Sequence, residues 1–241
     1  MCTRFVLLEQ HYRNILQRLG IGAATEYLSR YNIAPGTFVP AIRSRLKASG
    51  PADREVASLR WGLVPSWAKD DEGLKPANAR AESIATKPTF RQAFRTRRCV
   101  LPASGFYEWE HRGRTKQPWL FRRRDEQPFA LAGLWESWRA PNGACLETCA
   151  LITTRPNELM QQFHDRMPVL LTWDQCEPWL DPRLTDAAVL APLLEPVPAA
   201  DLQALAVSTY VSNSRNEGPA CLTPAPAGGE REDSPQLSLG I

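Results

Sequence analysis

Residues 98–110 have the sequence Arg-Cys-Val-Leu-Pro-Ala-Ser-Gly-Phe-Tyr-Glu-Trp-Glu, and this stretch decides the fold class. Its two runs rich in β-branched or aromatic residues, 98–101 and 105–110, are separated by Pro, Ala and Ser. Short runs of this kind, bounded by turn-forming residues, are typical of β-strands. More strands are expected for the same reason over 5–8, 119–123, 129–135, 146–153 and 205–211.

Segments with the spacing of an amphipathic helix are few and short. Residues 11–19 place apolar side chains at helical spacing and end at Gly20, which favours a helix. Shorter helices are expected over 89–97, 156–163 and 182–191. Asp181 would cap the last of these and Pro192 would end it. Because such irregular helices exclude repeated βαβ units, we expect an α+β fold with a mainly antiparallel, curved, barrel-like sheet and flanking helices.

The chain of 241 residues is long enough to bury a core without a metal or a disulfide. Residues 1–222 show no repeat and no internal linker, so we expect a single, monomeric domain. Residues 223–241 hold Pro, Gly and a charge cluster, which predicts a disordered tail. Apolar runs are too short for a transmembrane helix or a signal peptide, so no membrane contact and a cytoplasmic location are expected.

Six cysteines are present, at positions 2, 99, 145, 149, 176 and 221. A disulfide framework is not expected in a cytosolic chain of this size. Cys145 and Cys149 are close in sequence, but no Cys or His pair near them completes a zinc site. We therefore expect these two thiols to lie in or near the core, and we expect neither a metal nor another cofactor.

The formal net charge of +3 conceals an uneven distribution. Of the 29 basic residues 24 are Arg, and residues 80–124 alone carry a net charge of +9 with seven aromatic residues interleaved. Arg binds phosphate through its planar fork, and bases stack on aromatic rings. Nucleic-acid binding is therefore expected if the stretch folds onto one face. The alternatives are a codon bias toward Arg and a solvated basic surface around core aromatics.

Cys2 gains a special chemistry if Met1 is removed, as commonly happens before a small residue. Its α-amine and thiol then lie side by side, with reference pKa values of about 8 and about 8.5. The amine can condense with an aldehyde to an imine, and the thiolate can close on the imine carbon to give a thiazolidine ring. The same pair can also act as an N-terminal nucleophile in hydrolysis. A cysteine at position 2 without any catalytic role is the third alternative.

Proton transfer at Cys2 needs a carboxylate or an imidazole within reach. Glu108 lies between two aromatic residues, where partial desolvation would raise its pKa. Alternatively, Glu108 and Glu110 form the solvent face of their strand. His164 follows the expected helix over 156–163 and is either an acid–base group or a histidine that caps this helix.

Asn78 and Arg80 lie in the segment Pro-Ala-Asn-Ala-Arg-Ala-Glu-Ser. An Asn amide both donates and accepts hydrogen bonds, and an Arg can clamp a phosphate. Locally, this pair cannot be distinguished from two residues of a polar loop.

Several segments together carry more information than any one of them. They are 1–5 (MCTRF), 31–36 (YNIAPG), 60–68 (RWGLVPSWA), 78–83 (NARAES), 98–109 (RCVLPASGFYEW), 132–135 (AGLW), 153–154 (TT), 164–168 (HDRMP), 211–213 (VSN) and 216–219 (NEGP). In this order they resemble the SOS response-associated peptidase (SRAP) family over residues 1 to about 222. One departure is Thr3, where the family usually has Gly, and it puts the backbone geometry beside Cys2 in question.

The resemblance implies capture of abasic sites in single-stranded DNA. The opened abasic sugar presents an aldehyde, which an N-terminal Cys2 converts to a thiazolidine DNA–protein crosslink. The implied catalytic residues are Cys2 as amine and thiol, Asn78 holding the amine, Glu108 moving protons and His164 assisting sugar opening. The implied DNA-binding residues are Arg4, Asn32, Trp67, Arg80 and Arg166. The family's peptidase name implies that release of Met1 can be autocatalytic.

Two other functions stay open alongside this one. One is a peptidase that acts in trans through Cys2, and the other is a reader of single strands without chemistry. Residues 236–241, Gln-Leu-Ser-Leu-Gly-Ile, resemble the peptide with which bacterial proteins bind the replication sliding clamp, with Gly240 and Ile241 in place of its terminal Phe. The clamp is therefore a candidate partner, and a location at the nucleoid is expected.

Overall fold

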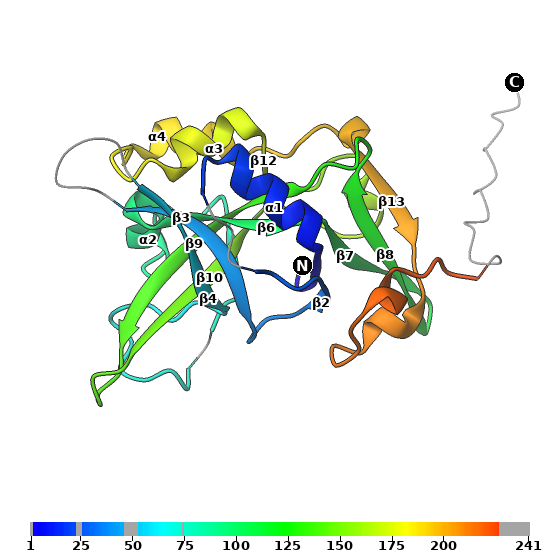
Figure 1. Cartoon of the computed structure of the whole chain (residues 1–241), viewed down its shortest axis with the longest axis horizontal. Helices are drawn as coiled ribbons and strands as arrows, with labels where there is room; N and C mark the ends of the chain where they lie inside the picture. The colour runs from blue at the N-terminus through cyan, green and yellow to red at the C-terminus, as the bar shows by residue number, and fades with distance from the viewer. Residues whose placement is uncertain (1, 23–25, 46–52, 74, 227–241) are drawn as a thin grey trace, which may run out of the picture.

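A closed five-stranded barrel forms one half of the computed structural model, which describes residues 2–22, 26–45, 53–73 and 75–226 (Figure 1). Its strands, in order around the barrel, are β3 (Phe38–Arg45), β4 (Asp53–Trp61), β10 (Cys145–Thr154), β9 (Phe129–Arg139) and β6 (Arg98–Ala103). The ring closes because β9 pairs with both β6 and β10, and β6 pairs with β3. Only the β4–β10 pairing in this ring is parallel. The predicted antiparallel, barrel-like sheet is confirmed.

A second, antiparallel sheet stands beside the barrel, on the right of Figure 1. Its order is β13 (Leu202–Ala206), β8 (Thr115–Arg123), β7 (Gly105–Arg112), β1 (Phe5–Leu7) and β2 (Arg30–Ile33). Three short strands extend the barrel: β5 (Asn78–Arg80), β11 (Met167–Pro168) and β12 (Leu170–Leu171). Because β6 and β7 are consecutive in the chain, the connection at Ser104 carries the backbone from the barrel into the second sheet.

The helices are short and lie outside the sheets. They are α1 (Glu9–Arg18), α2 (Arg91–Thr96), α3 (Trp173–Leu180) and α4 (Ala187–Leu190), with 3-10 turns η1 (Met160–Gln162), η2 (Ala191–Leu194), η3 (Ala199–Asp201), η4 (Thr209–Ser212) and η5 (Pro219–Leu222). The expected helix over 156–163 is wrong, because only η1 forms there. Asp181 ends α3, and the side chain of Asp186 caps α4 instead. No helix in the described ranges is long and apolar enough to cross a membrane.

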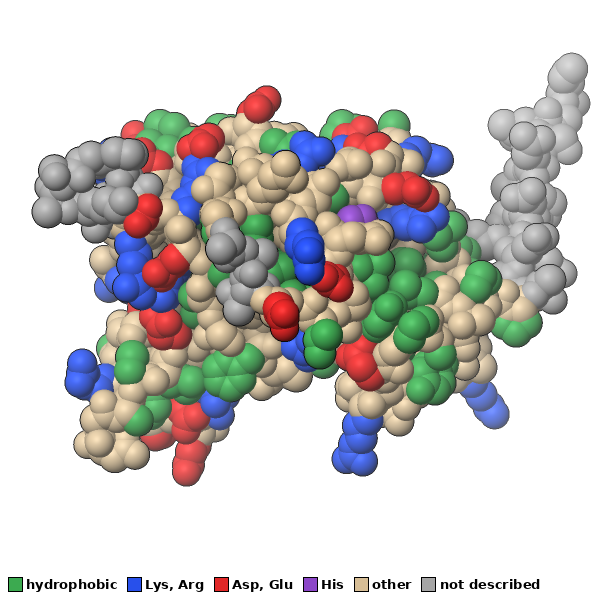
Figure 2. Space-filling model, viewed as in Figure 1, with side chains coloured by type: hydrophobic (Ala, Val, Ile, Leu, Met, Phe, Trp, Pro, Cys, Tyr) green, Lys and Arg blue, Asp and Glu red, His purple; other side chains and the backbone are tan. Residues whose placement is uncertain are grey.

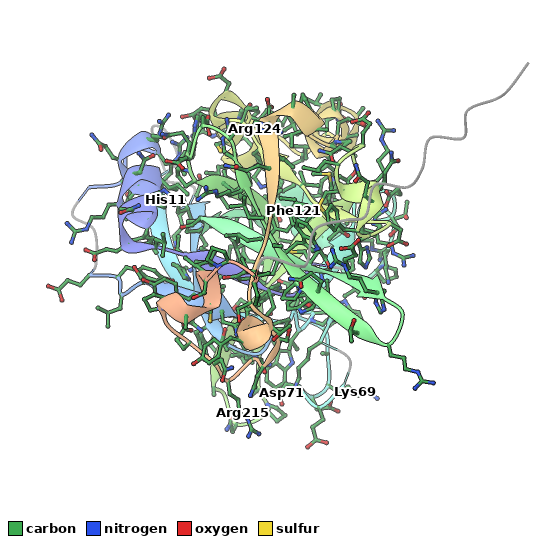
Figure 3. The ribbon with its side chains drawn as sticks, turned by 90° about the vertical axis from the view of Figure 1, so that its right-hand side faces the viewer. His11, Lys69, Asp71, Phe121, Arg124 and Arg215 are labelled. Atoms are coloured by element: carbon green, nitrogen blue, oxygen red, sulfur yellow. The ribbon has the colours of Figure 1, made fainter. Side chains whose placement is uncertain are left out.

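The aromatic residues of the basic stretch are mostly core residues. Phe90, Phe94, Phe106, Tyr107 and Phe121 are buried, and the rings of Phe106 and Phe121 stack 5.2 Å apart. Figure 3 shows Phe121 inside the molecule and Arg124 at its periphery, three residues along the same chain. The alternative of ordinary core aromatics is therefore correct for these five rings.

The basic residues of the stretch 80–124 also have different environments: some are buried or paired with carboxylates, and others are exposed. Arg98 is buried and donates hydrogen bonds to five backbone carbonyls, those of residues 94, 95, 179, 181 and 184. Burial lowers the pKa of Arg98 to about 10. Arg97, Arg112 and Arg123 form ion pairs with nearby carboxylates. On the face seen in Figure 2, basic and acidic side chains are interspersed. The stretch is therefore not one basic surface.

Residues 223–225 continue the described chain along β13. Pro224 bridges Val207, Thr223 accepts a hydrogen bond from Ser208, and Ala225 donates one to Ala206. The remainder of the expected tail, including the clamp-like segment 236–241, lies outside the described residues.

Because Arg98 is buried and its donors are used inside the fold, we expect its replacement to lower the stability of the protein. Arg98→Met should lower the free energy of unfolding by about 3 kcal/mol, because several buried carbonyls lose their donor. Arg95→Met, at an exposed position of α2, is the matched control and should have little effect. Chemical denaturation measures both, and equal stability of the two variants would contradict the assignment.

Candidate active site

The pairing of β1 with β7 places Cys2 beside Glu108. Phe5 is opposite Phe106, and the Tyr107 amide donates to the Arg4 carbonyl at 3.0 Å. Continued in the same antiparallel register, the chain before Arg4 runs past Glu108. Cys2 is fully buried, and its Sγ lies 3.9 Å from the Arg4 carbonyl oxygen. Burial, followed by the negative charge of Glu108, raises the pKa of the Cys2 thiol.

Glu108 is a buried carboxyl group. It is 4% exposed, so the alternative that it belongs to the solvent face is wrong. Burial raises the pKa of Glu108 above its ordinary value, one of the two alternatives drawn from its aromatic neighbours. Glu110, two residues along β7, has a different environment, because its Oε2 accepts a hydrogen bond from Trp119 and pairs with Arg112. The two carboxylates therefore have separate roles.

A groove of about 470 Å³ opens over these residues. Its lining comes from the N-terminal segment, the β7–β8 hairpin, the loop before β11 and the η4 turn: Thr3, Arg4, Glu108, Trp109, His111, Lys116, His164 and Ser212. The structure thus brings Glu108, His164 and Arg4 to one groove from distant parts of the sequence. Thr3 fits without backbone strain, since Glu126 is the one non-glycine residue with positive φ in the described chain.

His164 lies in the loop after η1 and does not cap an α-helix. Burial lowers the pKa of His164, so the imidazole is neutral near pH 7. Its Nδ1 lies 3.0 Å from the Arg166 amide and 2.7 Å from the carboxylate of Asp165. The first contact needs an unprotonated Nδ1 and the second a protonated one. The Asp165 side chain is 83% exposed and can turn away, whereas the Arg166 amide is fixed in the backbone. The contact with this amide therefore sets the tautomer of His164, with Nδ1 unprotonated and the ring proton on Nε2.

Asn78 and Arg80 lie at the two ends of β5. This strand pairs in parallel with β10, where Asn78 is opposite Leu151 and Arg80 is opposite Thr153. The Oδ1 atom of Asn78 is buried and has no hydrogen-bond partner in the described chain. Buried acceptors are normally satisfied, so this oxygen is suited to receive a donor from a ligand or a terminal amine. Arg80 is exposed.

Arg4 and Asn32 form a connected pair rather than two equivalent contacts. The Nη1 atom of Arg4 donates to Asn32 Oδ1 at 2.7 Å and to the Val211 carbonyl at 3.1 Å. Asn32 is 3% exposed, and its Nδ2 donates to the carbonyls of Val211, Asn213 and Asn216. The guanidinium of Arg4 also lies over the Trp109 ring, 5.5 Å from its centroid. Asn32 is therefore fixed by the backbone and in turn holds the Arg4 guanidinium through its Oδ1.

Trp67 and Arg166 have contrasting environments. Trp67 is 65% exposed, which is exceptional for an indole and suits it to stacking. The side chain of Arg166 is only 14% exposed and forms a bidentate ion pair with Glu82. Neither side chain contributes to the groove lining.

Four groove residues were missed by sequence reasoning: Trp109, His111, Lys116 and Ser212. Strand β7 continues beyond Glu110, where the predicted strand ended, and pairs His111 with Lys116 of β8. A longer predicted strand would have brought His111 to attention. Ser212, whose Oγ accepts from Trp109 Nε1 at 3.0 Å, comes from a segment more than 100 residues away. No group of three His, Cys, Asp or Glu in the described ranges is arranged to hold a metal ion.

Comparisons with known proteins agree on one family. The family described as SOS response associated peptidase (SRAP) matches residues 1–214. The Bacillus subtilis abasic site processing protein YoqW is 41% identical over 91% of this chain and 97% of its own length. The chicken (Gallus gallus) abasic site processing protein HMCES is 32% identical over 86% of this chain and 69% of its own length. A crystal structure of a Bacteroides thetaiotaomicron protein matches 93% of this chain and all of its own with a TM-score of 0.76 at 27% identity.

Proposed function

Because the chain belongs to the SOS response-associated peptidase (SRAP) family, we propose that it processes abasic sites in single-stranded DNA by forming a covalent crosslink through Cys2. The observation that carries this proposal is the burial of the Cys2 thiol within the electrostatic reach of Glu108. Glu108 lines a groove that His164 also lines. The similar proteins named for abasic-site processing support the choice of substrate.

The proposed reaction joins an aldehyde to an aminothiol with loss of one water. After removal of Met1, the α-amine of Cys2 attacks C1′ of the ring-opened abasic sugar to give a carbinolamine. Loss of water gives the imine, and the sulfur then adds to the imine carbon. The thiol proton moves to the imine nitrogen, so the product is a neutral thiazolidine. No oxidant or reductant is needed.

Each catalytic group has a task that suits its environment. The Cys2 thiol has a raised pKa, so it is protonated at neutral pH and needs a base before it can close the ring. The buried Glu108 carboxylate is the base, and it can return the proton because its own pKa is raised. Neutral His164 donates from Nε2 to the sugar oxygen during ring opening. Asn78 holds the amine through its buried, unpartnered Oδ1.

DNA binding combines cations and an exposed ring. We place the DNA backbone along Arg80, Arg4 and Arg166, with Trp67 stacking on a base. Asn32 contributes by holding Arg4. The groove-lining pair His111 and Lys116 adds two donors that sequence reasoning had not included.

The peptidase chemistry of the family name is a second candidate. Its supporting observation is the same thiol and carboxylate, which could act on the bond that follows Met1. An action in trans would require a peptide to enter the groove, whose basic lining suits a polyanion better. Release of Met1 in cis is therefore the more suitable peptidase role.

Intact-mass measurement tests the crosslink. The full chain lacking Met1, incubated with an abasic single-stranded oligonucleotide, should gain the mass of the DNA minus one water without borohydride. Cys2→Ala should form no adduct, and an undamaged oligonucleotide should give none with either protein. Absence of an adduct from the Met1-free protein would falsify the proposal. Peptide turnover that Cys2→Ala abolishes would support the peptidase instead.

The raised pKa of Glu108 predicts the pH dependence of crosslinking. The carboxylate is needed, and it is lost as pH falls through a pKa above the ordinary value of about 4.3. The wild-type rate should therefore decline on acidification at a higher pH than an ordinary glutamate would give. Glu108→Gln should be about a hundredfold slower at neutral pH and should keep only the decline that protonation of the α-amine causes, whose reference pKa is about 8. Glu110→Gln is the control, and an identical rate profile for Glu108→Gln and wild type would contradict the assignment.

We also propose that residues 236–241 bind the replication sliding clamp, which would bring the protein to DNA at the nucleoid. The support is the Gln-Leu-Ser-Leu pattern at the end of the chain. A pulldown with purified clamp should recover the full chain and lose it when residues 236–241 are removed. Equal recovery of both proteins would exclude the segment as the clamp ligand.

A further inference from the structure

Glu82 holds the side chain of Arg166 in a defined position. Arg166 Nη1 lies 2.7 Å from Oε1 and Nη2 lies 2.9 Å from Oε2 of the carboxylate, so the contact is bidentate. Nη2 also donates to the Thr153 carbonyl at 2.5 Å. This same carbonyl accepts the amide of Ala81, the residue before Glu82, at 2.8 Å. The pair therefore joins the end of β10, the turn after β5 and the loop before β11.

The main chain of Arg166 connects this clamp to the imidazole of His164. The Arg166 amide donates to His164 Nδ1 at 3.0 Å, which fixes the neutral tautomer with its proton on Nε2. The His164 amide is itself held by the Met160 carbonyl at 2.9 Å. A shift of the Arg166 backbone would weaken the contact to Nδ1 and permit the ring to rotate or to change tautomer.

A solvated surface ion pair would not hold the Arg166 backbone in place, since such pairs contribute little to stability. Here, however, the Arg166 side chain is 14% exposed, and its Nε is buried. A bidentate Arg–carboxylate contact adds geometric specificity as well as energy. The Glu82 carboxylate, at 54% exposure, is accessible to solvent but is held by two donors.

We infer that Glu82 is a positioning residue for His164, acting through Arg166, in the crosslinking reaction; the inference rests on the proposed function. Glu82 touches no reacting atom. It fixes the Arg166 side chain, the Arg166 amide fixes Nδ1, and the imidazole then presents Nε2–H toward the groove. Loss of the carboxylate should therefore lower the maximal rate of the step that His164 assists, in addition to any change in DNA affinity that follows from releasing Arg166.

A double-mutant cycle tests this route. Single-turnover crosslinking is measured with Met1-free wild type, Glu82→Gln, His164→Ala and the double variant, at saturating abasic single-stranded oligonucleotide. Glu82→Gln should lower the maximal rate by about tenfold in the wild-type background. In the His164→Ala background the same change should cost less than about twofold, because the group that it positions is gone. Glu82→Asp, which keeps the charge, should recover part of the loss.

Glu9→Gln is the control, because the Glu9 carboxylate is about as exposed as that of Glu82 but pairs with a solvated Arg13 on α1, away from the groove. It should leave the rate unchanged. An equal loss from Glu82→Gln in both His164 backgrounds would overturn the inference, as would a change in half-saturation alone. Tighter binding of an undamaged oligonucleotide at an unchanged rate would show that Glu82 only repels DNA.

The tautomer of His164 provides a readout that does not depend on crosslinking. The chain has three histidines, so ¹⁵N-labelled imidazole signals can be assigned by substitution. His164 should show Nε2–H in the wild type and in Glu9→Gln, and mixed tautomers in Glu82→Gln. An unchanged tautomer in Glu82→Gln overturns the inference. A wild type that shows this tautomer but forms no adduct contradicts the proposed function alone.

Discussion

The antiparallel pairing of β1 with β7 is the constraint on which the candidate site depends. It joins the first residues of the chain to a strand that begins a hundred residues later, through the Arg4 carbonyl and the Tyr107 amide. Without this pairing, the N-terminal segment would be an ordinary mobile end of the chain. With it, Cys2 is buried beside Glu108, which lines the groove. The barrel and the second sheet meet where β6 runs into β7, so the same strand carries the acid and connects the two halves.

Burial is the common physical cause of the chemical properties of the site. It raises the pKa values of Cys2 and Glu108 and lowers that of His164, so all three groups tend toward their neutral forms. A raised pKa makes the Glu108 carboxylate a stronger base toward the thiol than an ordinary glutamate would be. The enclosure that would slow an unassisted thiol therefore also makes its neighbour a suitable proton carrier.

The sequence predicts those parts of the fold and site that depend on local pattern. The strands at 98–101 and 105–110 follow from composition, whereas the aromatic neighbours of Glu108 make its burial only one of two alternatives. The β3–β4 hairpin could not be predicted, because Arg43, on β3, is charged yet 2% exposed. Its burial is compensated by Glu55 and Glu147 on two other strands, which is visible only in the assembled barrel. The amide of Asn32 donates to three distant carbonyls, and no local pattern in the sequence shows these contacts.

The excess of arginine over lysine has a structural explanation as well as the proposed one in DNA binding. Arg43 joins two carboxylates and lies over Trp135, Arg98 serves five carbonyls, and Arg166 joins Glu82 to Thr153. Each contact set uses several donors held in a plane, which a lysine ammonium cannot offer. Codon bias can explain an arginine on the surface, but it does not explain a guanidinium whose donors are matched to fixed acceptors in the interior. Part of the basic charge that suggested nucleic acid therefore serves to hold the sheets and loops around the groove.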